Sequence, residues 1–282
     1  MLSYRHGYHA GNHADVLKHM LLCLTLRFLN QKDKPYSIID THSGAGIYSL
    51  NSVFAQKNKE YLTGLNKVIT NEKLHKLIPE YYEVIKSIND KASKLDFYPG
   101  SPLFECALSR EEDRLTFIDL HPAEIEVLKK NFNRDIRVNI QRRNGFEALN
   151  ALVPPSPRRG LCVIDPSYEE KSDYLELVKY IKIAIKKWNV GSFFIWYPVL
   201  ARTIDHSKKL VQDIKRLNLP LLQAELQIET QKEDIGMCGS GILLINYPFG
   251  IETKIEEIMN ELYKVLGNEG AKAKVKILNE KE

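Results

Sequence analysis

The sequence predicts an α/β protein whose sheet is mostly parallel and ends in an antiparallel hairpin. Short apolar segments rich in β-branched residues alternate with amphipathic helical stretches along most of the chain, as in strands joined by crossover helices. The last two expected strands, 225–229 and 241–246, are joined by a polar loop too short for a crossover helix, so they should pair antiparallel. The first strand runs into a glycine-containing loop, as in sheets that bind ligands at their carboxyl edge.

The first helix is expected from about residue 13 to residue 29. Asn12 is a suitable N-cap with Asp15 three positions on, and apolar residues follow at helical spacing. A strand at 36–40 ends in Asp40 and opens into the loop 41–46. Further strands are expected at 115–119, 138–141, 161–165 and 192–196, before the hairpin. A parallel sheet closed by an antiparallel hairpin is typical of the class I, Rossmann-like methyltransferase arrangement and differs from a nicotinamide-binding domain.

The spacing after the glycine loop predicts an insertion. In a dinucleotide-binding fold the acid that grips the ribose follows this loop by about 20 residues. Here Gly46 and the candidate acid Asp119 lie 73 positions apart. The segment 54–95 reads as two or three lysine-rich helices, so we expect a small helical subdomain there and a core made of 1–53 and 96–282. Its lysines could hold a large anionic substrate or form a solvated face.

Composition excludes several classes of protein. With 282 residues, 44% of them hydrophobic and 27% charged, the chain is neither disordered nor fibrous. Its four cysteines are far apart and form no CxxC pair, which indicates reduced, packed thiols and no zinc site. No apolar run has the length of a signal or a membrane span, so we expect a cytoplasmic protein. Because the net charge is only +4, a nucleic-acid surface would need local basic clusters, such as 129–143 and 158–159.

The tetrapeptide Asp165-Pro-Ser-Tyr168 is the most informative motif. It ends a strongly apolar run, which places it at the carboxyl edge of a central strand. The motif fits methylation of an exocyclic adenine amine. Such an amine is a poor nucleophile, and the Asp165 carboxylate and the Pro166 carbonyl would supply two acceptors that orient it. Tyr168 would offer a flat face for the base, a contact worth about 1–3 kcal/mol in single-strand binders.

Each motif also has a purely structural interpretation. Asp-Pro can serve turn geometry alone, and small residues after a strand can simply permit close helix packing. In the order glycine loop, strand-terminal Asp119 and strand-terminal Asp165 tetrapeptide, the motifs together favour an enzyme.

Beyond these motifs, the N-terminal stretch Leu2-Ser-Tyr-Arg-His6 and the segment His9-Ala-Gly-Asn-His-Ala-Asp-Val-Leu-Lys-His19 carry a specific resemblance. The chain resembles the RlmJ-type 23S ribosomal RNA adenine-N6 methyltransferases. The similarity continues through 40–46, 98–102, 121–122, 158–160, 165–168, 196–198 and 239–241, and so spans nearly the whole chain.

This resemblance implies a cytoplasmic, monomeric bacterial enzyme with no obligate protein partner, no membrane contact and no metal. It would use S-adenosyl-L-methionine to methylate N6 of one adenine in 23S rRNA, preferably on protein-free RNA. Asp165, Pro166 and Tyr168 would be catalytic. The implied cofactor contacts are His19, His42, Ser101, Asp119, Asn144, Gly145 and Asp165. The implied RNA contacts are Tyr4, Arg5, His6 and Lys18, of which the first three could order into a lid.

The sequence departs from the family pattern at three positions. Ser167 replaces the usual second proline, and Asp119 and Asn144 stand where relatives often carry Glu and Asp. All three changes keep hydrogen-bond acceptors near the site, so cofactor affinity is what they put in doubt.

Three rival functions remain at this point. A DNA adenine methyltransferase would use the same tetrapeptide but has no evident target-recognition domain here. A nicotinamide oxidoreductase would need an acid close behind the glycine loop. A non-catalytic RNA-binding assembly factor would not need Asp165.

Overall fold

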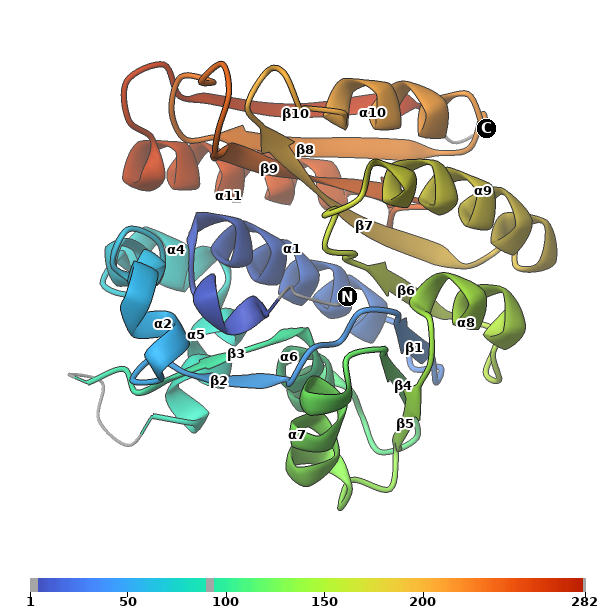
Figure 1. Ribbon diagram of the computed structural model, residues 1–282. Coiled ribbons are helices and arrows are strands. Elements are labelled where there is room, and N and C mark those ends of the chain that lie inside the picture. The colour runs from blue at the N-terminus through green and yellow to red at the C-terminus, as the bar shows by residue number, and fades with distance from the viewer. Residues whose placement is uncertain (1–4, 90–93, 281–282) are drawn as a thin grey trace.

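The computed structural model describes residues 5–89 and 94–280, and its centre is an eight-stranded sheet in the order β10-β8-β9-β7-β6-β1-β4-β5 (Figure 1). Its strands are β1 (Ser37–Asp40), β4 (Arg114–Asp119), β5 (Val138–Arg142), β6 (Gly160–Ile164), β7 (Ser192–Leu200), β8 (Leu221–Gln227), β9 (Met237–Ile245) and β10 (Lys272–Asn279). A separate two-stranded sheet pairs β2 (Ile47–Ser49) with β3 (Phe97–Pro99).

The predicted strand directions are confirmed. Strands β5, β4, β1, β6 and β7 run parallel, whereas β9 is antiparallel to both β7 and β8. The hairpin strands begin earlier than predicted, because Leu221 already pairs with Ile245. Strand β10 was not predicted from the sequence. It pairs antiparallel with β8 at the edge of the sheet, and its lysines alternate with small or apolar residues.

Helices cover both faces of the sheet (Figure 1). One face packs against α1 (His13–Asn30), α6 (Ser101–Leu108), α7 (Pro122–Phe132) and α11 (Ile251–Leu266). The other packs against α8 (Gly145–Leu152), α9 (Lys171–Lys187) and α10 (Ser207–Lys215). All four cysteines are buried and free, and none of the described helices is long and apolar enough to cross a membrane.

The first helix forms where the sequence predicts it. Asn12 caps it, because its side chain accepts hydrogen bonds from the backbone N–H groups of Ala14 and Asp15. Nearly all of its residues are buried, since the helix lies between the sheet and a group of short helices. This burial on all sides explains why even its polar side chains find partners inside the molecule.

Short helices fill the chain between β2 and β3. They are α2 (Val53–Asn58), η2 (Glu60–Leu62), α3 (Leu65–Val68), α4 (Glu72–Leu77) and α5 (Pro79–Ser87). Their apolar side chains, among them Leu65, Leu74 and Tyr81, belong to the same core cluster as α1 and α11. The expected division into a core and a subdomain at 54–95 stays a prediction.

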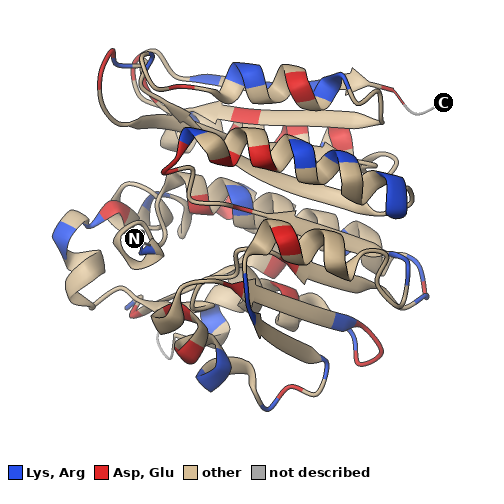
Figure 2. Ribbon diagram, turned by 45° about the vertical axis from the view of Figure 1, so that its right-hand side comes forward, with Lys and Arg blue, Asp and Glu red and all other residues tan. Residues whose placement is uncertain are grey.

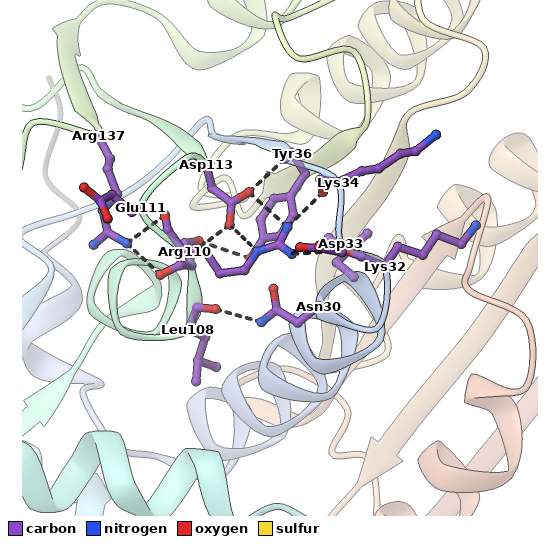
Figure 3. Close-up of polar contacts among 12 residues, drawn as sticks. Asn30, Lys32, Asp33, Lys34, Tyr36, Leu108, Arg110, Glu111, Asp113 and Arg137 are labelled. Atoms are coloured by element: carbon purple, nitrogen blue, oxygen red, sulfur yellow. Dashed lines mark hydrogen bonds and ion pairs between the residues drawn. The ribbon is translucent and has the colours of Figure 1, made fainter.

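Part of the predicted basic surface is structural. Figure 3 shows Asp113 accepting from the Tyr36 N–H (2.8 Å) and from Arg110, close to where β1 and β4 begin. Arg137 donates to the carbonyls of Ser109 (2.6 Å) and Cys106 (3.0 Å). Arg159, just before β6, donates to the Lys34 carbonyl at 2.6 Å. These groups lie at the amino ends of the parallel strands, opposite the edge where Asp165 lies. Elsewhere lysine and arginine are interspersed with acids (Figure 2).

Candidate active site

A cleft with about 1110 Å³ of empty space opens at the carboxyl edge of the parallel strands. The loop after β1, the ends of β4 and β6, and the first residues of α6 and α8 all contribute to its wall. Six residues predicted as cofactor contacts line it: His42, Ser101, Asp119, Asn144, Gly145 and Asp165.

The buried carboxylate of Asp40 organises the floor of the cleft. Its Oδ2 accepts from the Ser101 hydroxyl at 2.6 Å, and its Oδ1 accepts from the His42 N–H at 3.1 Å. Burial raises the pKa of Asp40 to about 6, even though both hydrogen bonds favour the ionised form. Asp40 therefore joins the loop after β1 to the start of α6, which brings Ser101 into the cleft.

Asp119 presents a carboxylate at the end of β4. Its Oδ2 accepts from the Gly44 N–H at 2.9 Å and its Oδ1 from the His121 N–H at 2.7 Å. Burial raises its pKa, while these hydrogen bonds oppose the rise. Each oxygen keeps a further lone pair, so the fixed carboxylate could accept from the hydroxyls of a ribose.

The start of α8 leaves no room for a side chain at Gly145. A Cβ there would lie 2.2 Å from the Thr41 carbonyl oxygen and 2.9 Å from the His42 ring. Asn144 caps the same helix by accepting from the N–H groups of Phe146 and Glu147. His42 is held by Thr41, whose hydroxyl lies 2.8 Å from Nδ1, and burial lowers its pKa to about 4, so the ring is neutral at pH 7.

A second cavity adjoins the cleft at Asp165. It has about 670 Å³ of empty space, and its wall includes Tyr168 and Trp196. Asp165, Ser167, Lys18 and His6 line both spaces, so Asp165 lies where they meet. Pro166 lines only the cleft.

The Tyr168 ring is held in place at the wall of the second cavity. The backbone of Tyr168 is left-handed, with φ of 52°, and the Tyr168 hydroxyl donates to the Trp196 carbonyl at 2.7 Å. The ring packs against Tyr174 at a centroid distance of 4.5 Å. These contacts orient an aromatic face beside Asp165.

The Lys18 side chain points toward the Asp165 carboxylate rather than outward. Its Nζ lies 2.6 Å from Asp165 Oδ2 and 3.3 Å from Asp15 Oδ1, and the residue is only 5% exposed. Burial alone would lower the pKa of Lys18, but Asp165 and Asp15 raise it by more. Lys18 is therefore a charged partner of Asp165, and its predicted contact with RNA stays a prediction.

The predicted RNA-binding residues near the N-terminus are only partly within the described chain. Tyr4 lies outside the described residues. The Arg5 guanidinium lies over the Phe54 ring at 5.1 Å, and His6 begins the short helix η1 (His6–Tyr8). His6 reaches both cavities and stacks at an angle against Tyr48, with ring centroids 4.9 Å apart.

The chain is similar to known proteins over nearly its whole length. The family described as "Ribosomal RNA large subunit methyltransferase D, RlmJ" matches residues 33–278. The chain belongs to this family. It is 39% identical over 267 residues to "Ribosomal RNA large subunit methyltransferase J" of Escherichia coli, covering 94% of each chain. It is 40% identical over 271 residues to the protein of the same name in Haemophilus influenzae, covering 96% of each.

A solved structure extends the comparison to the fold. The crystal structure of protein LPL1258 from Legionella pneumophila superposes with a TM-score of 0.87 at 34% identity, covering 95% of this chain and 98% of the other. With this match and the sheet order, the class I methyltransferase arrangement predicted from the sequence is confirmed.

One predicted cofactor residue of this family member lies away from the cleft. His19 is 0% exposed, its Nδ1 lies 2.9 Å from the Tyr98 hydroxyl, and its ring packs on Phe104 at 4.8 Å. It lines neither of the two cavities. Lys18 and His19 are neighbours on a helix, so when one side chain points to the active site the other is rotated by about 100° into the core. A cofactor contact at His19 stays a prediction.

Several residues of the site were missed by the sequence analysis. Phe146 lines the cleft and contacts the His42 ring edge-on at 5.2 Å; its signal was an apolar residue directly after Asn144-Gly145. Trp196 and Pro198 line the second cavity from the carboxyl half of β7. Asp15 also lines that cavity, and its helical N-terminal position had suggested only a capping role.

Proposed function

We propose that the chain transfers a methyl group from S-adenosyl-L-methionine to N6 of an adenine in 23S rRNA. The observation that carries this proposal is the meeting of two cavities at Asp165, because methyl transfer needs a donor and an acceptor on either side of one orienting carboxylate. Membership of a ribosomal RNA large subunit methyltransferase family supports the substrate class. Since that substrate is ribosomal RNA, we propose that the protein works in the cytoplasm. We also propose that it acts as a monomer, as the family resemblance implies.

The first cleft fits S-adenosyl-L-methionine. The Asp119 carboxylate is fixed where the ribose hydroxyls of a nucleoside could donate to it. Gly145 lets the start of α8 pack against the loop after β1, beside the cleft. Ser101 and His42 lie on the side of Asp40, where they could contact the amino-acid part of the cofactor. When bound, the cofactor supplies an electrophilic methyl group.

The second cavity fits the target base. Its aromatic wall at Tyr168 and Trp196 can stack against an adenine that has left its helix, while contacts of the protein with the RNA phosphates outside the cavity hold the RNA in place. The carboxylate of Asp165 and the carbonyl of Pro166 then accept hydrogen bonds from the two N–H bonds of the amine. This holds the nitrogen lone pair toward the methyl donor.

Asp165 acts chiefly by orientation and charge. Attack of the neutral amine on the donor methyl group would form the N–C bond as the methyl–sulfur bond breaks, and the resulting N6 cation would then lose its proton to solvent. The negative charge of Asp165 stabilises this developing cation, and Lys18 holds the carboxylate in one orientation through the 2.6 Å contact.

The experiment that tests the proposal offers labelled S-adenosyl-L-methionine with protein-free 23S rRNA, assembled large subunits or duplex DNA, and identifies the modified nucleoside after digestion. We expect N6-methyladenosine in the protein-free RNA. Label in DNA alone would transfer the assignment to a DNA adenine methyltransferase. Label in none of the substrates would leave an RNA-binding assembly factor.

A further inference from the structure

Asp15 connects the N-terminal segment to the catalytic carboxylate. Its Oδ2 accepts from the Gly11 N–H and from His6 Nε2, both at 2.9 Å, and its Oδ1 lies 3.3 Å from Lys18 Nζ. Lys18 in turn lies 2.6 Å from Asp165 Oδ2. An unbroken chain of polar contacts therefore runs from His6 through Asp15 and Lys18 to Asp165.

The Asp15 carboxylate is ionised although it is only 2% exposed. Burial raises its pKa, but His6 and Lys18 lower it by more, so the net shift is downward. A buried charge of this kind is tolerated only when its partners stay in place, and removing one partner leaves the others uncompensated. The contacts of Asp15 are therefore coupled to one another.

Asp15 acts on one side of the active site only. It lines the second cavity and is absent from the wall of the first cleft. Asp15 and Lys18 lie three residues apart on the same face of α1, and Lys18 reaches Asp165 where the two spaces meet. Because Asp15 itself contacts only the base cavity, a change at Asp15 should alter the use of the RNA more than the affinity for the cofactor.

We propose that Asp15 is a positioning residue for methyl transfer. With one oxygen it keeps the Lys18 ammonium on Asp165, and with the other it anchors His6 at the mouth of the base cavity. The position of residues 5–11 and the orientation of the Asp165 carboxylate then depend on the same side chain. This inference rests on the proposed function, because it assigns Asp15 to the RNA side of the same reaction.

A purely structural role for Asp15 makes a different prediction. Acids in the first turn of a helix stabilise it by interacting with its N-terminal dipole. Loss of that effect would lower the free energy of unfolding without changing the kinetics of the protein that remains folded. The turnover number and the mobility of residues 5–11 separate the two roles.

The test uses the isosteric substitution Asp15→Asn, with Asp113→Asn as a matched control. Asp113 is also a fully buried acid that accepts from a backbone N–H and binds a cation, Arg110, but it lies at the opposite edge of the sheet (Figure 3). We expect Asp15→Asn to lower kcat for RNA methylation about tenfold or more, since a charged hydrogen bond is lost. The dissociation constant of S-adenosyl-L-methionine should stay within about twofold of the unmodified protein. Asp113→Asn should lower thermal stability and leave kcat unchanged.

The variant His6→Ala measures the coupling between His6 and Asp15. It also tests the proposal if Asp15→Asn does not fold. If Asp15 works through His6, His6→Ala should lower kcat by itself and add little in the Asp15→Asn background. The proposal would be overturned if the two substitutions lowered kcat independently, so that their fold-changes multiply in the double variant. It would also be overturned if Asp15→Asn had the same kcat as Asp113→Asn.

A readout that needs no turnover keeps this inference separate from the proposed function. Amide hydrogen exchange of residues 5–11 should accelerate in Asp15→Asn and stay unchanged in Asp113→Asn. Unchanged exchange in both would refute the anchoring role of Asp15. If exchange accelerates as expected but the unmodified protein methylates no RNA, the proposed function fails while the anchor stands.

Discussion

At the scale of single residues, the site depends on close packing at a glycine as well as on its polar side chains. Gly145 lets the N-terminus of α8 approach the loop after β1, where the Thr41 carbonyl and the His42 ring already fill the space of a Cβ. His42 and Asn144 stay beside the cleft only because this approach is close. The small residue is therefore a requirement of packing at the binding site.

Substitution of Gly145 by alanine should impair cofactor binding. Overpacking against backbone costs about 1–3 kcal/mol and must push α8 or His42 away. We expect the dissociation constant of S-adenosyl-L-methionine, measured by calorimetry, to rise about tenfold or more. Gly250→Ala is the control, because Gly250 has a φ of 78° with nothing within 4 Å, so only backbone strain of about 1–2 kcal/mol is added. Equal affinities in the two variants would argue against this role of Gly145.

Asp165 allows charge and shape to be separated. Asp165→Asn keeps a carbonyl that can accept from the amine, but it removes the negative charge and leaves the Lys18 ammonium with one carboxylate instead of two. We expect single-turnover methyl transfer to fall about 100-fold or more. Asp165→Ala should abolish transfer. Near-normal turnover of Asp165→Asn would show that orientation alone suffices.

At the scale of elements, the short helices between β2 and β3 support the N-terminal segment. Glu60 of η2 accepts from Asn12 Nδ2 at 3.0 Å and binds His9 Nδ1 at the same distance. The Gly11 carbonyl accepts from the Leu65 N–H at 2.8 Å. Because η1 and the start of α1 rest on these short helices, the helices fix where His6 lies beside the two cavities (Figure 1).

The Glu60–His9 pair should make the stability of the protein depend on pH. The hydrogen bond from His9 to Glu60 raises the pKa of His9 above 6.5, although burial acts in the opposite direction. Burial would raise the pKa of Glu60, but the hydrogen bonds from His9 and Asn12 lower it by more, so that it falls below 4.5. The His9 contribution is therefore complete below pH 6.5 and is lost as pH rises through its folded pKa. The Glu60 contribution is lost as pH falls through its own folded pKa.

The measurement is the free energy of unfolding in denaturant. Glu60→Gln should destabilise the protein more at pH 5.5 than at pH 9, where His9 is neutral in both proteins. Glu256→Gln, on the exposed side of α11, should change stability equally little at both pH values. A loss for Glu60→Gln that does not vary with pH would exclude the ion pair as its cause.

At the scale of the whole molecule, β10 closes one edge of the sheet. It pairs with the full length of β8 and carries lysines at alternate positions, of which Lys272 and Lys276 are exposed and Lys274 is partly exposed. Charged edge strands of this kind prevent pairing with another chain. Strand β10 therefore protects an apolar sheet at the end farthest from β5.

Removal of residues 272–282 should uncover the edge of β8. We expect the free energy of unfolding to fall by about 3 kcal/mol or more, because a whole ladder of strand hydrogen bonds is lost. Light scattering should reveal concentration-dependent self-association. Truncation after Asn279, where β10 ends, should change neither property. A monodisperse, stable protein without β10 would contradict this protective role.

The sequence alone determined the kind of fold and the edge of the sheet that holds the site. Helical and strand periodicities, the glycine loop and Asp165 at a strand end are local patterns, and they predicted the parallel strands, the antiparallel hairpin and a ligand site at the carboxyl edge. The family resemblance added Asn144 and Gly145 to that site. Only the tertiary structure decided which charges meet. Lys18 pairs with Asp165 across 147 positions, His19 turns into the core, and Arg137 and Arg159 bind backbone carbonyls at the opposite edge. These outcomes depend on packing between distant segments, because burial removes water and each charged group must find its partner wherever the fold brings one.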